Sequence, residues 1–335
     1  MVGPTSVAAF ARPRLSRSLL DLATSVVPFL LLSALMFWSA NVSYPLALVI
    51  AVPAGGFLVR TFIVFHDCAH GSFFRSARAN TWVGRFCGIL VFAPFAAWRH
   101  DHAVHHATSG DLDRRGIGDV PTLTVAEYEA MALPKRIGYR VFRNPLVMFG
   151  LGPILAMILA PRWISFSARP RLVRSVWLTN FALVAVVGCL CLLAGWRDFL
   201  LVWGPPALIA GSVGVWLFYV QHQFEDTYWE SSGDWSYADA ALRGSSYLHL
   251  PQPLQFFTGN IGLHHVHHLS TRVPNYNLQR AHDETPILQS VPTLTLRDGL
   301  RTARLKLWDE ECRKLVRFSA LRRQPDASLT LSDAT

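Results

Sequence analysis

The sequence predicts an all-α integral membrane protein with four transmembrane helices in two hairpins, interfacial helices, and a cytoplasmic helical cap that holds a dinuclear metal site. Three observations lead to this prediction. Of the 335 residues, 51% are apolar and only 16% are charged, and the mean hydropathy is +0.28, which is more apolar than an ordinary soluble domain. Four apolar stretches are long enough to cross a bilayer. Most of the 13 histidines fall into three tight clusters.

The N-terminal part of the chain predicts a short tail and the first hairpin. Residues 1–18 form the expected cytoplasmic tail, and the apolar stretches 19–38 and 44–65 each approach the roughly 20 residues that a membrane helix needs. The uncharged link between them is short, so both helices must turn on the same side of the membrane. The tail lacks the small-residue cleavage site of a signal peptide, and the first span is therefore expected to be retained.

The second hairpin is predicted from stretches 176–195 and 199–220. Its orientation follows from the basic residues: Lys and Arg number 3 in the N-terminal tail, 14 in residues 66–176 and 12 in residues 221–335. Basic residues collect on the cytoplasmic side of membrane proteins. Both termini and the long intervening segment are therefore expected to be cytoplasmic, and the net charge of +9 is better explained by topology than by nucleic-acid binding.

Two shorter apolar stretches, 84–98 and 144–160, are rich in Gly and Pro and lie at or below the length of a span. We interpret them as interfacial or re-entrant helices, because a single crossing by either would separate the histidine clusters. The membrane domain is expected to cover residues 19–318, and the polar tail 319–335 is expected to be disordered. Five cysteines without a CxxC spacing exclude a disulfide scaffold and a cysteine-based zinc site.

Each histidine cluster has the spacing of metal ligands on a helix. His66 and His70 lie at positions i and i+4 at the cytoplasmic end of the second span. The other two clusters repeat an i, i+3, i+4 pattern: His102, His105 and His106 in the first, and His264, His267 and His268 in the second. One such pair is weak evidence, but three clusters in one chain indicate a metal site.

The number and type of these ligands predict two metals. Eight imidazoles exceed what one tetrahedral zinc ion can use, and imidazole also suits iron. The clusters contain no ExxH pair, which argues against a carboxylate-bridged di-iron bundle and favours a histidine-dominated dinuclear iron centre.

Further candidates surround these clusters. His222 emerges from the fourth span at the level of His66 and is expected to be a ninth ligand. Metal-bound imidazoles usually donate their second N–H to a carboxylate or carbonyl. The candidates for such partners are Asp67, Asp101, Asp111 and Asp113. Asn260 could hold a metal-bound water or could be a turn residue, and these alternatives stay open.

The three clusters resemble the histidine boxes of membrane fatty acid desaturases: His66-Asp67-Cys68-Ala69-His70, His102-Ala103-Val104-His105-His106 and His264-His265-Val266-His267-His268. The segments 111–116 and 221–229 are most similar to bacterial acyl-lipid desaturases of the omega-6 or delta-12 type. The resemblance covers roughly residues 50–290. It also implies a location in the cytoplasmic membrane of a bacterium.

The resemblance implies an O2-dependent di-iron enzyme that introduces a cis double bond into the acyl chain of a membrane lipid. It assigns one iron to His66, His70, His102, His106 and His267, and the other to His105, His222, His264 and His268. The chain has no His-Pro-Gly-Gly haem motif, so an external electron donor such as ferredoxin is expected.

Two other functions are compatible with parts of this pattern. A hydroxylase or ketolase acting on alkanes or carotenoids uses similar boxes and is the main alternative. A metal transporter would place ionisable residues along the cores of the spans. Here the histidines lie at the span ends, which argues against a transporter.

Overall fold

The computed structural model of the protein describes residues 4–323 and is mostly helical, as predicted. Four of its helices are long and apolar enough to cross a membrane: α1 (Leu15–Ala40), α2 (Tyr44–His70), α7 (Pro170–Ala194) and α8 (Trp196–His222). Each contains nearly all of the corresponding predicted span. At their C-terminal ends α2 and α8 extend beyond the apolar stretches, through His70 and His222, whereas α1 and α7 begin earlier than predicted.

The two predicted hairpins are joined by short links. Residues 41–43 connect α1 to α2, and Gly195, with a φ of 88°, connects α7 to α8. At the other end of α2, Gly71 adopts a left-handed conformation with a φ of 70°. This left-handed conformation ends the helix directly after His70. Glycine is favoured at the position because a residue with a side chain would be strained there.

The two shorter apolar stretches lie in bent helix pairs. Helices α3 (Ala77–Leu90) and α4 (Phe95–Thr108) meet at 100°, and α6 (Leu133–Phe142) meets the segment Val147–Arg162 at 60°. That segment contains two π-helical turns, Val147–Leu151 and Ile154–Leu159, and ends in a 3-10 turn, Ala160–Arg162. Each pair is a broken span or a re-entrant element, so the described residues hold four to six apolar spans.

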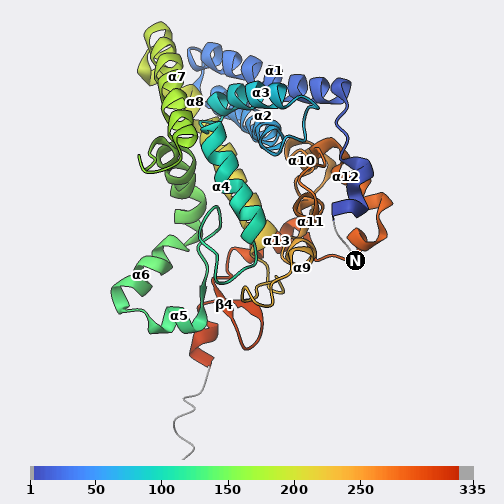
Figure 1. The fold of residues 1–335 in the computed structure, drawn as a ribbon. Helices are drawn as coiled ribbons and strands as arrows, with labels where there is room; N and C mark the ends of the chain where they lie inside the picture. The colour runs from blue at the N-terminus through green and yellow to red at the C-terminus, as the bar shows by residue number, and fades with distance from the viewer. Residues whose placement is uncertain (1–3, 324–335) are drawn as a thin grey trace, which may run out of the picture.

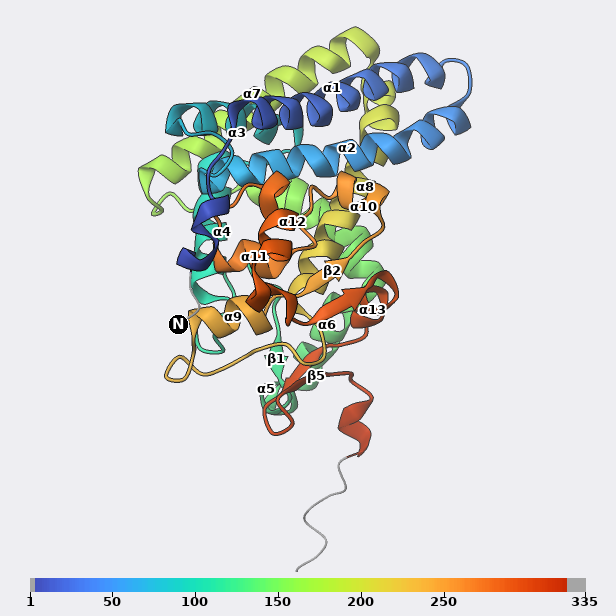
Figure 2. The same cartoon turned by 90° about the vertical axis from the view of Figure 1, so that its right-hand side faces the viewer.

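Figure 1 and the perpendicular view in Figure 2 show two layers, with α1, α2, α3 and α7 in the upper one. The lower layer contains short helices: α5 (Val125–Ala130), α9 (Tyr237–Arg243), α10 (Gln252–Phe257), α11 (His264–Leu269), α12 (Asn275–Glu284) and α13 (Leu296–Thr302). Helix α4 runs from the upper layer into the lower one in both views. The histidine-bearing ends of the long helices therefore meet the short helices.

Two small sheets join the lower layer, a feature that the all-α prediction did not include. The first sheet is the parallel pair of β2 (Tyr247–His249) and β3 (Thr293–Thr295). The second sheet has the order β1 (Leu123–Thr124), β4 (Leu307–Asp309), β5 (Lys314–Val316). These strands are only two or three residues long, too short to give an alternating pattern in the sequence.

Three further 3-10 turns are described: Pro4–Phe10, Pro286–Gln289 and Ala320–Arg323. Of the tail predicted at 319–335, residues 324–335 lie outside the described residues, as do residues 1–3 of the predicted N-terminal tail.

A buried apolar core that includes Ile63, Val220 and Val266 joins α2, α8 and α11 beside the histidines.

Candidate metal centre

Three elements bring together a group of five histidines at the junction of the two layers. Each residue offers one ring nitrogen, and these five atoms all lie within 4.8 Å of one another. The group comprises His66 and His70 from α2, His102 and His106 from α4, and His267 from α11. We call it the five-histidine group.

A second set of four histidines adjoins the first, and its ring nitrogens also lie within 4.8 Å of one another. The four are His105 from α4, His222 from α8, and His264 and His268 from α11. We call it the four-histidine group. The two groups touch, since the ring centroids of His106 and His268 are 4.2 Å apart.

Helices α4 and α11 contribute to both groups because of their helical geometry. Successive residues of an α-helix are separated by about 100° around its axis. His102 and His106, four residues apart, point to the five-histidine group, while His105 points to the other. On α11, His264 and His268 share the four-histidine group and His267 faces away from it. The membership of the two groups is the same as the resemblance implies.

The outward ring nitrogens of three histidines have hydrogen-bond acceptors. Nδ1 of His66 lies 3.2 Å from Oδ1 of Asp67, and Nδ1 of His105 lies 2.5 Å from Oδ1 of Asp119. Nδ1 of His222 lies 3.1 Å from the carbonyl oxygen of Gly244. A carbonyl or carboxylate oxygen requires a proton on Nδ1, so Nε2 of each ring keeps a free lone pair.

The inward nitrogens lie close together without an arrangement of hydrogen bonds that could satisfy them all. Nε2 of His106 lies 3.2 Å from Nε2 of His102 and 3.0 Å from Nε2 of His267. In the four-histidine group, Nε2 of His222 lies 3.0 Å from Nε2 of His264. Nε2 atoms of His70, His105 and His268 are buried without a hydrogen-bond partner among the described residues. Converging lone pairs on buried imidazoles fit a metal ion in each group.

Burial also keeps the metal-facing rings of α11 in the form that binds metals. Desolvation, followed by the nearby His66 and His106, holds the pKa of His267 well below its usual value. The pKa of His264 and that of His268 are lowered well below their usual value in the same way, by burial and then by neighbouring histidines. The α11 imidazoles are therefore neutral at pH 7, which leaves their lone pairs available.

Of the four acidic candidates near the boxes, the structure brings Asp67 to a clustered histidine. Asp101 is exposed and pairs with His100. Asp111 instead accepts hydrogen bonds from Arg114 and Ser232, which closes a loop of the lower layer.

Two further candidates also have structural partners. Asp113 accepts a hydrogen bond from the backbone of Ser232. Asn260 has a φ of 58°, as in a turn, and its side-chain amide donates to the backbone carbonyl of Asn275 at 3.2 Å. A metal-bound water at Asn260 stays a prediction.

The sequence did not point to Asp119, although it contacts His105 more closely than Asp67 contacts His66. Its position depends on Gly118, whose φ is 71° and where an added Cβ would lie 3.0 Å from the Cβ of His105. Only glycine allows the loop to pass this close to α4. A Gly-Asp pair in a loop is too common to be a signal, and the carbonyl of Gly244 has no signal in the sequence at all.

Comparison with known proteins agrees with the histidine pattern. The family model described as fatty acid desaturase matches residues 12–291. A fatty acid desaturase of Bacillus subtilis is 49% identical over 319 residues, which cover 95% of this chain and 91% of that protein. The chain spans smaller parts of two Synechocystis proteins. An sn-1 acyl-lipid omega-3 desaturase (ferredoxin) is 30% identical over 66% of this chain and 62% of its own length, and an sn-1 oleoyl-lipid 12-desaturase is 29% identical over 68% and 65%.

Proposed function

Since this chain belongs to the fatty acid desaturase family, a family of oxidoreductases, we propose that it uses O2 and two iron ions to introduce a cis double bond into the acyl chain of a membrane lipid. The observation that carries the proposal is the pair of buried histidine groups, which could each hold one metal ion. The desaturase domain is taken to extend over residues 19–318.

The nine histidines are the proposed iron ligands, divided as the two groups divide them. When bound, two iron ions would supply the O2 activation that an unactivated methylene requires, because such a carbon offers neither an acidic proton nor a leaving group. Neutral imidazole suits iron, and the low pKa values on α11 favour that form.

The residues around the ligands orient them and keep water away. Asp67, Asp119 and the Gly244 carbonyl hold protons on the outward nitrogens of their histidines. Trp98 stacks on His102 with ring centroids 4.3 Å apart, and Phe218 lies 5.0 Å from His105. These aromatic faces cover the imidazoles with apolar surface, which strengthens the electrostatic interactions within the site.

The helices and the relatives support the proposed substrate and location. Four apolar helices support an integral membrane protein, and the distribution of Lys and Arg supports both termini and the metal site on the cytoplasmic side of a bacterial membrane. An acyl-lipid substrate and a ferredoxin-type electron donor are supported by a relative whose name states both.

The position of the new double bond is proposed to be of the delta-12 or omega-6 type. The 12-desaturase of Synechocystis and chloroplast omega-6 desaturases of plants, 25% identical in Arabidopsis, support this choice. The omega-3 relative is as similar, so the position needs direct measurement. A hydroxylase or ketolase remains the alternative outcome of the same metal chemistry.

The test is the lipid profile of a host that makes only saturated and monounsaturated chains and carries a compatible ferredoxin system. Mass spectrometry with double-bond location compares the intact protein with His105→Ala and with His249→Ala, an exposed histidine outside both groups. A diene with a new bond at carbon 12, made by the intact protein and by His249→Ala but not by His105→Ala, is expected. A new bond elsewhere would overturn the position, and a hydroxylated or oxidised product would favour the alternative.

A further inference from the structure

A buried ion pair joins the first two membrane helices away from the histidines. Arg60, in the apolar part of α2, pairs with Asp21 of α1, and both residues are almost completely buried. Arg60 also donates to the backbone carbonyl of Phe256, and its guanidinium carbon lies 4.0 Å from the centroid of the Phe256 phenyl ring. Charged residues within membrane helices are costly to bury and are commonly retained for function.

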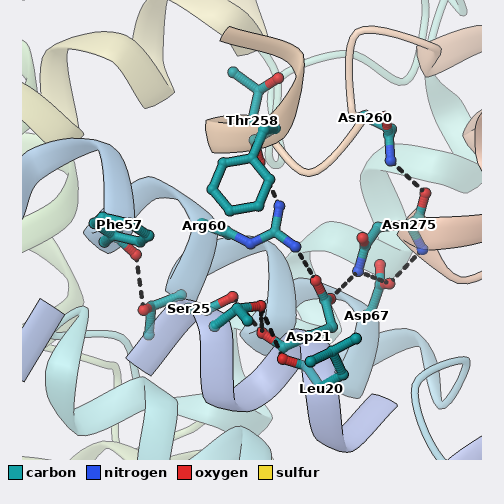
Figure 3. A network of polar contacts seen from close by, with 12 residues as sticks. Leu20, Asp21, Ser25, Phe57, Arg60, Asp67, Thr258, Asn260 and Asn275 are labelled. Carbon is teal, nitrogen blue, oxygen red and sulfur yellow. Dashed lines mark hydrogen bonds and ion pairs between the residues drawn. The ribbon is translucent and has the colours of Figure 1, made fainter. Parts of the chain in front are cut away.

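Hydrogen bonds connect this ion pair through Asn275 to Asp67 (Figure 3), the carboxylate beside the proposed iron ligand His66. The side-chain amide of Asn275, at the start of α12, donates to Oδ2 of Asp21 at 2.8 Å and to Oδ2 of Asp67 at 3.0 Å. The backbone N–H of Asn275 donates to the same oxygen of Asp67 at 2.7 Å. The other oxygen of Asp67 faces Nδ1 of His66 at 3.2 Å.

The hydrogen bonds of this network fix the orientations of the Asn275 amide and the Asp67 carboxylate. The Asn275 amide has two hydrogens, and each goes to a different carboxylate. Asp67 accepts through both of its oxygens, so its carboxylate plane is fixed from the side opposite to His66. Any movement of Asp21 is therefore transmitted through Asn275 to the imidazole.

We propose that Asp21, Arg60 and Asn275 are positioning residues for His66, so that helix α1 is part of the support of the five-histidine group. The ion pair with Arg60 fixes Asp21. The carboxylates of Asp21 and Asp67 then fix the Asn275 amide, and Asp67 sets the orientation and basicity of His66. The proposal rests on the proposed function only in that His66 binds a metal.

The structure offers a matched asparagine outside this network. Asn80 of α3 is 4% exposed, against 1% for Asn275. Its amide donates to the carbonyls of Phe74 and Ser76 and its oxygen accepts from the backbone of Phe74. Asn80→Ala thus removes a similar set of buried hydrogen bonds without breaking a connection to a clustered histidine.

The test measures metal affinity of each histidine group separately, with the full chain in detergent micelles and Co2+ as the probe. His264→Ala provides a background in which the five-histidine group is intact. The double variant His70→Ala, His102→Ala leaves only three imidazoles in that group and provides a background in which the four-histidine group is intact. Asn275→Ala is expected to weaken Co2+ binding about 10- to 100-fold in the first background and to leave the second unchanged. Asn80→Ala should change neither.

Equal affinity of Asn275→Ala and its parent in the His264→Ala background would overturn the proposal. Equal weakening in both backgrounds would also overturn it, because it would indicate a general loss of stability. The paired variant Asp21→Asn, Arg60→Gln removes both charges together and is expected to reproduce the selective loss. The lipid assay is independent: an intact protein that binds two metals but forms no new double bond would refute the proposed function and leave this inference open to its own test.

Discussion

The two histidine groups are held in place by different parts of the molecule. In the five-histidine group, Asp67 directly follows His66 on α2 and is fixed by Asn275. In the four-histidine group, Asp119 comes from a loop, and the carbonyl of Gly244 supports His222. One group is thus supported by a carboxylate on a membrane helix, which Asn275 of α12 holds in place, and the other by loops of the lower layer.

The support of each group includes a buried arginine, and the two arginines differ in the groups to which they donate hydrogen bonds. Arg60 faces the carboxylate of Asp21, whereas Arg143 is completely buried and donates to neutral oxygens, including the carbonyl of Pro121, the hydroxyl of Tyr219 and the amide of Gln223. Pro121 belongs to the loop that carries Asp119. The comparison shows two ways to stabilise a buried cation, by an opposite charge or by several dipoles.

Removing one ligand from each group should give the largest effects. His70→Ala leaves four imidazoles in its group, whereas His264→Ala leaves three in the other. We expect both variants to lose detectable desaturation and His264→Ala to lose one metal per chain, while His70→Ala retains more. Metal content of the purified proteins by plasma mass spectrometry checks this, with His249→Ala as the control. Equal metal loss in the two variants would contradict the difference in ligand number.

The carboxylate supports can be compared by Asp119→Asn and Asp67→Asn. Each should weaken metal binding about 10- to 100-fold in its own group, because a neutral amide makes the imidazole less basic. Asp67→Asn should also lower the thermal midpoint. Its amide cannot accept from Asn275 on one side and from His66 on the other, whereas Oδ2 of Asp119 has no such partner among the described residues. Co2+ titration and unfolding in micelles separate the two effects, and identical midpoints would contradict this account.

The two arginines should differ in stability. Arg60→Met leaves Asp21 as an unpaired buried carboxylate, for which we expect a cost of about 3–5 kcal/mol. Arg143→Met leaves neutral acceptors unpaired, for which we expect about 1–3 kcal/mol. Unfolding by denaturant in micelles measures both, with the exposed Arg140→Met as the control. A larger loss in Arg143→Met would mean that the dipoles around it stabilise more than the carboxylate beside Arg60.

The sequence predicted the long helices and the three histidine clusters because each depends on local patterns, whereas the division of the histidines between two groups came from the family resemblance. An apolar stretch such as 44–65 identifies a span by itself, and the i, i+3, i+4 spacings place histidines on a helix. The helix ends were predicted less accurately, since α2 continues through the polar residues of the first histidine box. The short strands β2 and β3 were missed because their pairing joins residues far apart in the chain.

The supports of the histidines were predictable only where they were adjacent in sequence. Asp67 neighbours His66, so proximity alone suggested it. Asp119 reaches His105 through a loop that Gly118 admits, and Asn275 reaches Asp67 across more than half of the chain. Asp101 is as close to a histidine box in sequence as Asp67 is, yet it points to His100 and solvent. The direction of a side chain, and not its sequence distance, decides which carboxylate supports a ligand.

A smaller, pH-dependent effect should appear behind the four-histidine group. Lys306 is 6% exposed, and its ammonium donates to the carbonyl oxygens of Arg143 and Ala303. Burial, with a contribution from the charge of Arg143, lowers the pKa of Lys306 from 10.5 to about 8. Between these values the unfolded chain binds more protons at this position than the folded one, so stability should rise with pH from about 8 to 10.5.

Lys306→Met removes the group that titrates and should flatten this part of the stability profile. Unfolding of the intact protein and the variant in micelles at several pH values from 7 to about 10.5 measures the difference between their slopes, in which groups common to both proteins cancel. The Lys314→Met variant is the control, because Lys314 is exposed and its partners Glu225 and Asp226 raise its pKa instead. A difference slope of zero would mean that folding leaves the pKa of Lys306 unchanged, and a slope of the opposite sign would mean that folding raises it; either result would contradict this account.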